Sequence, residues 1–80
     1  MQSSDNVEAA LISILHESGK LTGTISHHED LFTELGVKSA NSISILLAME
    51  DRFGLTIDDA KFVKARTLHN LIQLVNETVS

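Results

Sequence analysis

Residues 30–53, DLFTELGVKSANSISILLAMEDRF, decide the fold of this 80-residue chain. They lead from an apolar anchor through Gly36 to Ser39, and then into the most hydrophobic run of the sequence. That run predicts a helix over residues 39–53, followed by Gly54 in the left-handed conformation that commonly ends a helix. A serine at the start of this helix is either an ordinary cap or a point of chemical attachment.

The apolar residues of this predicted helix form two stripes. The first has the helical spacing of a core face and consists of Ile45, Ala48, Met49 and Phe53. The second consists of Ala40, Ile43 and Leu47. In a small bundle this second stripe is either core as well or a partly exposed binding face.

Three further helices are expected around this one. The first covers residues 5–18, with an Asp5–Glu8 capping box, Gly19 as its left-handed end, and a core face of Val7, Leu11, Ile14 and Leu15. A short third helix over residues 59–64 is capped by Asp58 and turns Phe62 and Val63 inward. The last is capped by Thr67 and has a core face of Leu68, Leu71, Ile72, Val75 and Val79.

The long connection over residues 20–38 has no helical period, and we expect one helical turn in it at residues 30–35. Apolar side chains should hold it on the core: Leu21, Ile25, Leu31, Phe32, Leu35 and Val37. The prediction is an all-α fold, a four-helix bundle with a long first loop and a short third helix. Residues 1–80 are read as a single domain, with residues 1–4 as a flexible tail.

Composition limits the classes of partner. The formal net charge is −5, from eleven acids against six bases, which disfavours nucleic acid and favours basic protein surfaces. No apolar run approaches membrane-spanning length, and the start of the chain lacks the pattern of a secretory signal. We therefore expect a cytoplasmic monomer without a membrane partner.

The candidates for catalytic or metal chemistry are the four histidines and Ser39. His27 and His28 precede two acids, but adjacent loop residues rarely converge on one ion, so they are read as solvated; His16 and His69 are read as surface or boundary residues. Ser39 has no base nearby in sequence, and the serine-hydrolase elbow and the phosphate-binding loop are both absent. The chain is therefore predicted to be no enzyme and to bind no metal.

Attachment at Ser39 has its own physical rationale. A phosphate ester on this hydroxyl would lie at the positive end of the helix macrodipole, where backbone N–H groups favour an anion. The cap and the attachment interpretations both suit a serine here, and the residues alone leave them open.

The ordered motif resembles the acyl carrier protein and peptidyl carrier protein superfamily. The motif begins with an acid (Asp30), an apolar pair (Leu31 and Phe32) and a Leu-Gly turn (Leu35 and Gly36), and continues to Ser39. It ends with Glu50, Asp51, Phe53, Gly54, Leu55 and Ile57. The resemblance extends over residues 5–79 and includes the helix order, the long first loop and the short third helix.

The resemblance implies a function. Members of the superfamily receive 4′-phosphopantetheine from coenzyme A on this serine, here Ser39, through a phosphopantetheinyl transferase and Mg²⁺. The terminal thiol then carries acyl, aminoacyl or polyketide groups as thioesters between enzymes. Loading and transferring enzymes dock on the second helix, which here presents Lys38, Ala40, Ile43, Leu47, Glu50 and Asp51.

The chain departs from the family around the serine, where Lys38-Ser39-Ala40 replaces Asp-Ser-Leu, and Asn41 and Ser44 stand where acids are common. A reversed charge favours a dedicated partner, and a specialised lipid, polyketide or peptide pathway over housekeeping fatty-acid synthesis. Two alternatives are an unmodified carrier-fold interaction module, and an unrelated bundle that dimerises through Ile43 and Leu47.

Overall fold

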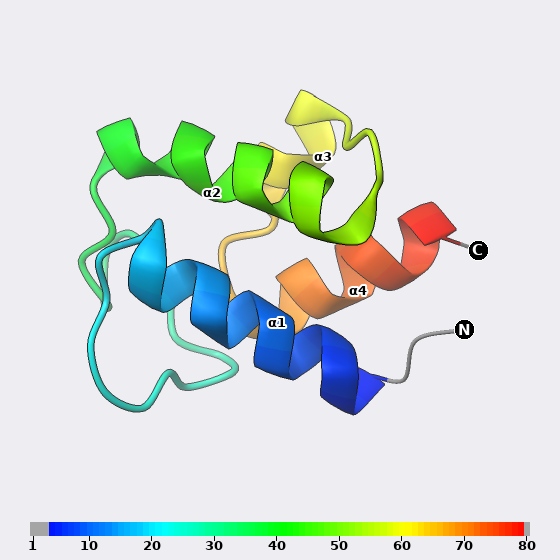
Figure 1. Cartoon of the computed structure of the whole chain (residues 1–80). Helices are drawn as coiled ribbons and strands as arrows, with labels where there is room; N and C mark the ends of the chain where they lie inside the picture. The colour runs from blue at the N-terminus through cyan, green and yellow to red at the C-terminus, as the bar shows by residue number, and fades with distance from the viewer. Residues whose placement is uncertain (1–3, 80) are drawn as a thin grey trace.

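The computed structural model describes residues 4–79, and the side chains of residues 6–78, and this part of the chain is helical without strands. The helices are α1 (Ser4–Glu17), α2 (Ser39–Phe53), α3 (Asp59–Lys64) and α4 (Leu68–Val79). In Figure 1, α1 runs opposite to α2 and α4, and the long first loop passes around one end of the molecule. The predicted four-helix bundle with a long first loop and a short third helix is confirmed.

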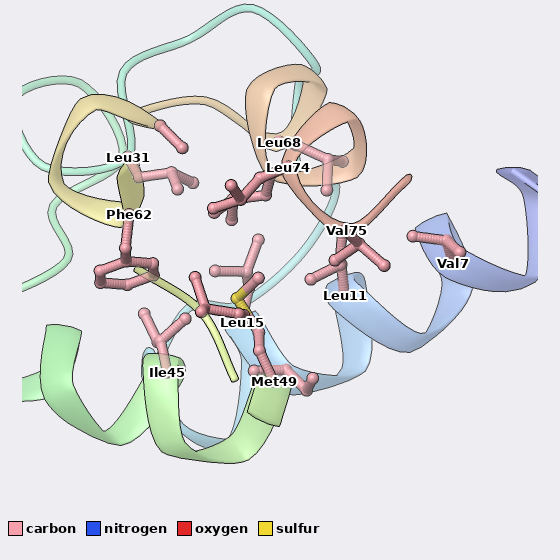
Figure 2. Close-up of a cluster of buried hydrophobic side chains, with 14 of the residues drawn as sticks. Val7, Leu11, Leu15, Leu31, Ile45, Met49, Phe62, Leu68, Leu74 and Val75 are labelled. Carbon is pink, nitrogen blue, oxygen red and sulfur yellow. The ribbon is translucent and has the colours of Figure 1, made fainter. Parts of the chain in front are cut away.

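One apolar core joins the helices, with α1 packed against both α2 and α4 and with α3 packed against α4. Figure 2 shows side chains from every helix converging, among them Leu11 of α1, Ile45 of α2, Phe62 of α3 and Leu68 of α4. Leu11, Leu15, Met49 and Leu68 are fully buried. The core faces predicted for α1, for the first stripe of α2 and for α4 are confirmed. The one exception is Val79 of α4, whose side chain lies outside the described residues.

Three of the predicted helix ends are confirmed. Gly54 ends α2 in the left-handed conformation, with φ 65° and ψ 39°. The Asp58 carboxylate accepts a hydrogen bond from the Ala60 N–H at 2.8 Å, and the Thr67 hydroxyl accepts one from the Asn70 N–H at 3.1 Å. The short helix α3 and the last helix therefore begin where their side-chain caps satisfy free N–H groups.

The start of the chain was predicted less well. Ser4 already belongs to α1, so the proposed tail is too long by one residue, and residues 1–3 lie outside the described part. The side chain of Asp5 is also outside it, so the capping box stays a prediction.

Gly19 was assigned the wrong role. The left-handed residue after α1 is Lys20, with φ 59°, and Gly19 is not among the residues with positive φ. A Cβ at Gly19 would lie 2.6 Å from the Leu15 carbonyl oxygen and 3.2 Å from Cδ1 of Ile45. The glycine is needed mainly because a Cβ would clash with the backbone of α1 one turn back, with the Ile45 side chain of α2 also close, and not because of its own dihedral angles.

The long first loop is held on the core as predicted. Ile25, Leu31 and Val37 are buried, and the other apolar loop residues pack against the core: Leu21, Phe32 and Leu35. The expected helical turn at residues 30–35 is present, because the N–H groups of Glu34 and Leu35 both donate to the Asp30 carbonyl at 3.0 Å. This fixed loop leads directly into α2.

Candidate functional site

Ser39 is the first residue of α2 and is exposed. The N-cap position belongs to Lys38, in extended conformation, and no side chain caps this end of the helix. Within the described residues no hydrogen bond engages the Ser39 hydroxyl, although its carbonyl accepts one from the Ser42 hydroxyl at 2.7 Å. The ordinary cap interpretation of Ser39 is therefore wrong.

The position of Ser39 is set by the residues just before it. Gly36 has φ 86°, a conformation that side-chain-bearing residues rarely adopt. Val37 is buried, and its N–H donates to the Leu31 carbonyl at 2.8 Å. A buried anchor two residues before Ser39 thus fixes the start of α2 while the hydroxyl remains in solvent.

A second set of contacts fixes the same loop to Arg66, in the link between α3 and α4. The Arg66 guanidinium donates to both carboxylate oxygens of Asp30, at 2.7 and 3.2 Å, and lies 4.9 Å from the centre of the Phe32 ring. The Leu31 N–H donates to the Arg66 carbonyl at 2.7 Å. The hydrogen bond from Arg66, followed by those from the Thr33 and Phe32 N–H groups, holds the pKa of Asp30 well below its usual range.

The start of α2 is electropositive. Its first turn contains no acid, and Lys38 adds a full positive charge to the partial positive charge of the helix end. The chain carries five more acids than bases overall, so this end contrasts with the rest of the molecule. An anion covalently held at the Ser39 hydroxyl fits this environment, because free N–H groups and a cation lie beside it.

The second stripe of α2 is an exposed face, which resolves the alternative that the sequence left open. Ile43 is 64% and Leu47 is 59% exposed, and Ala40 is exposed as well. With Lys38, Glu50 and Asp51 these residues form what we call the outer face of α2. Burial cannot account for large apolar side chains in this position, so the stripe is available to a partner.

An apolar groove of about 440 Å³ separates the outer face of α2 from α3. It is lined by Ser42, Ile43, Leu46, Leu47 and Glu50 of α2 and by Asp59, Phe62 and Val63 of α3. Val63 is 63% exposed, so the prediction that it turns inward is wrong. The three large apolar side chains that stand exposed in the described part, Ile43, Leu47 and Val63, all border this groove.

Glu50 has a structural role that the sequence did not reveal. It is half-buried, and its carboxylate accepts a hydrogen bond from the Ile57 N–H at 2.9 Å. Its carbonyl accepts from the N–H groups of Gly54 and Leu55. Glu50 therefore ties the link between α2 and α3 to the end of α2, whereas Asp51 is fully available on the surface.

The histidines do not form a metal centre in the described residues, where no three potential metal ligands of the His, Cys, Asp or Glu type converge. His27 is paired with Glu8 of α1 at 3.1 Å, and His28 lies beside the ring of His69. His16 is hydrogen-bonded through its ring to the Gly23 carbonyl at 2.8 Å. Each thus contacts, or belongs to, the long first loop.

Two features of the site were missed in the sequence, one with a local signal and one without. Val63 follows Phe62, and successive helical residues point about 100° apart, so only one of the two can face the core squarely. That spacing was sufficient to show that Phe62 and Val63 could not both turn inward. The pairing of Asp30 with Arg66 joins residues 36 apart in sequence and had no local signature.

Comparison with known proteins agrees with this geometry. Residues 8–75 match the family model described as "Phosphopantetheine attachment site". A curated relative, the "Acyl carrier protein" of Rickettsia bellii (strain RML369-C), is 26% identical over 78 residues, which cover 96% of this chain and 91% of the relative. None of the described helices is long and apolar enough to cross a membrane.

These findings settle the superfamily and its chemistry. Proteins of this family hold 4′-phosphopantetheine covalently and act as carriers rather than as catalysts. The exposed, unengaged serine and the electropositive helix start are compatible with such a group. The matched region includes all of α2 and α3 and most of α1 and α4, and the chain belongs to the phosphopantetheine-attachment family of carrier proteins.

Proposed function

We propose that Ser39 is the residue that carries 4′-phosphopantetheine, and that the chain presents acyl or aminoacyl thioesters on this arm to partner enzymes. The observation that carries the proposal is the exposed, unengaged hydroxyl of Ser39 at the first position of α2, inside the matched family region. A transferase needs such a hydroxyl, because it must approach the oxygen from solvent.

Lys38 and the start of α2 would hold the phosphodiester of the arm. The first N–H groups of a helix favour an anion, and a lysine at the N-cap adds a charge of the right sign. When bound, the group supplies a terminal thiol that holds its cargo as a thioester. The protein supplies a fixed attachment point, because Val37 and the pair of Asp30 with Arg66 restrain the preceding loop.

The outer face of α2 is the proposed docking surface for the transferase and for the loading and transferring enzymes. Ile43 and Leu47 offer apolar contact, and Asp51 offers a carboxylate to a basic partner. Glu50 contributes charge at the edge of the apolar groove, although its carboxylate is already bound to the Ile57 N–H. The apolar groove is the proposed shelter for the hydrocarbon part of the cargo.

Lys38 and Ala40 support a specialised role. They place a cation and a small side chain where a partner first meets the attachment point. Like-charge contact disfavours a partner that presents a base there, so a dedicated partner with an acid opposite Lys38 is expected. On this basis the carrier serves specialised lipid, polyketide or peptide biosynthesis, and a cytoplasmic, monomeric state stays a prediction.

The proposal is tested by intact mass spectrometry after incubation with coenzyme A, Mg²⁺ and a broad-specificity phosphopantetheinyl transferase. We expect the mass of one phosphopantetheinyl group on the native chain and none on Ser39→Ala. We also expect slow loading, and faster loading of Lys38→Asp, by a transferase that prefers an acid at this position. Full-rate loading of the native chain by that transferase would contradict the role given to Lys38.

The second candidate is a carrier-fold interaction module that is never modified. The exposed outer face of α2 would suit it equally, because docking does not need the arm. Failure of every transferase to load the folded native chain would favour this function, and loading of Ser39→Ala would move the attachment point elsewhere.

A further inference from the structure

A second groove, between α3 and α4, is lined by two lysines and one glutamate on a chain whose net charge is negative. It measures about 240 Å³ and lies on the side of α3 away from the apolar groove, since the α3 residues that line the two are different. Lys61 and Lys64 line this groove, whereas Asp59 and Val63 line the other. We call it the lysine groove.

The lysines of this groove are free to bind. Residues 61–66 hold three of the six bases of the chain and no acid. The Arg66 side chain is committed to Asp30, whereas Lys61 and Lys64 are exposed and their ammonium groups have no ion pair or hydrogen bond in the described part of the chain. Because they are three residues apart on α3, both ammonium groups lie on the same side of the helix.

The floor and the far wall of the groove complete a binding surface. Ala65 and Leu74 form a buried apolar floor, at 7% and 5% exposure. Asn70 and Gln73 on α4 are exposed and offer amides opposite the lysines. Amide side chains can both donate to and accept from a peptide backbone, and an apolar floor suits a small side chain.

We propose that the lysine groove binds an acidic peptide segment of a partner protein, with its carboxylates on Lys61 and Lys64. Charge complementarity identifies the partner, because the groove presents two unpaired cations on a chain with a net charge of −5. Glu77 at the α4 wall disfavours a carboxylate beside it, and so restricts the acids to the α3 side. Two lysines are too few for a nucleic-acid backbone, which needs an extended basic face.

This inference does not depend on Ser39, because the lysine groove and the attachment point share no residue. A carrier with this groove has two separate contacts, one at α2 for enzymes that act on the cargo and one at α3 and α4 for the acidic segment. Loss of either one leaves the other in place.

The test is a nuclear magnetic resonance titration of the isotopically labelled full chain with a capped peptide of alternating glutamate and alanine. The matched control peptide has glutamine in place of every glutamate. We expect amide shifts at Lys61, Lys64, Asn70 and Gln73 with the acidic peptide, and weaker binding as salt is raised. The same titration on Ser39→Ala should be unchanged, which separates this inference from failure of the proposed attachment.

Variants sharpen the test. Lys64→Glu should weaken binding about tenfold, because an attraction becomes a repulsion at an exposed pair. Arg52→Glu makes the same charge change at the end of α2 and should leave binding within about twofold. Dispersed spectra report whether each variant is folded. If Lys64→Glu is not folded, Lys64→Gln takes its place, with a smaller expected loss of binding.

Several outcomes would overturn the proposal. These are absence of shifts at millimolar peptide, equal binding of the glutamine peptide, and equal weakening by Arg52→Glu and Lys64→Glu. Shifts that map to the apolar groove would also refute it. Concentration-dependent shifts at the same groove without peptide would assign it to a second copy of the chain instead.

Discussion

Replacing Lys38 by aspartate should stabilise the fold, although Lys38 is the residue that we assign to partner choice. Lys38 occupies the N-cap of α2 with φ −79° and ψ 145°, which are suitable angles for a capping residue, but its side chain makes no cap hydrogen bond. An aspartate there can accept from the N–H of Ala40, as Asp58 accepts from Ala60, whereas the Asn41 N–H already donates to the carbonyl of residue 38. A good cap contributes about 1 kcal/mol, and exchanging a cation for an anion at this helix end about 1 kcal/mol more.

The sum, about 2 kcal/mol, should raise Tm by about 10 °C in a domain of this size. Lys38→Asn separates the two effects, because it caps without a negative charge and should give more than half of the gain. Arg52→Asp is the matched control, since it makes the same change in net charge in the last turn of the same helix. There the dipole has the opposite sign, so Tm should fall.

The assay is thermal unfolding followed by circular dichroism, with chemical denaturation to give the free energy of unfolding. An unchanged or lower Tm in both Lys38→Asp and Lys38→Asn would refute the view that this helix end is uncapped. An equal rise in Lys38→Asp and Arg52→Asp would attribute the effect to net charge instead of to position.

Three further predictions test the packing and the loop. Gly19→Ala should cost about 1–3 kcal/mol in denaturant unfolding, because its Cβ would lie 2.6 Å from a backbone oxygen of α1; a cost near zero would show that α1 can move away. Phe62→Ala should cost about 3–5 kcal/mol, whereas Val63→Ser should stay within about 0.5 kcal/mol because Val63 is 63% exposed; equal costs would contradict their assigned faces. Asp30→Asn should destabilise the native state at neutral pH. The difference in the free energy of unfolding between this variant and the native chain should shrink below about pH 4. The pKa of Asp30 is lower in the folded than in the unfolded chain, so its carboxylate stabilises the fold above the unfolded pKa, and this stability is lost as the pH falls. A difference independent of pH would refute this origin.

Local signals predicted the fold well. The bounds of α2 followed from one apolar run and Gly54, and the starts of α3 and α4 from Asp58 and Thr67. The cap and glycine signals act within one helical turn, so the neighbouring residues are sufficient to place these helix ends. Ser39 was located in the same way as the first residue of α2, whereas its role as the attachment point came from the family resemblance and stays a prediction.

Errors arose where two distant segments decide the outcome. At Gly19 the space for a side chain is limited by the Leu15 carbonyl one turn back and also by Ile45, which is far along the chain. Glu50 binds the N–H of Ile57 across a turn, and Asp30 binds Arg66 across 36 residues. Hydrophobic periodicity reports which side of a helix is apolar, but not which loop or carboxylate lies against it.

The start of α2 is the place where the chain breaks the rules that it follows elsewhere. Helices α3 and α4 begin with the side-chain caps that a stable helix favours, whereas α2 begins with a lysine whose side chain makes no cap hydrogen bond. An aspartate at position 38 would supply such a cap, so stability does not explain the lysine. Departures from local consistency are expected at functional sites. Because this one lies beside an exposed serine whose hydroxyl is unengaged, it supports Ser39 as the attachment point and Lys38 as a determinant of which partner reaches it.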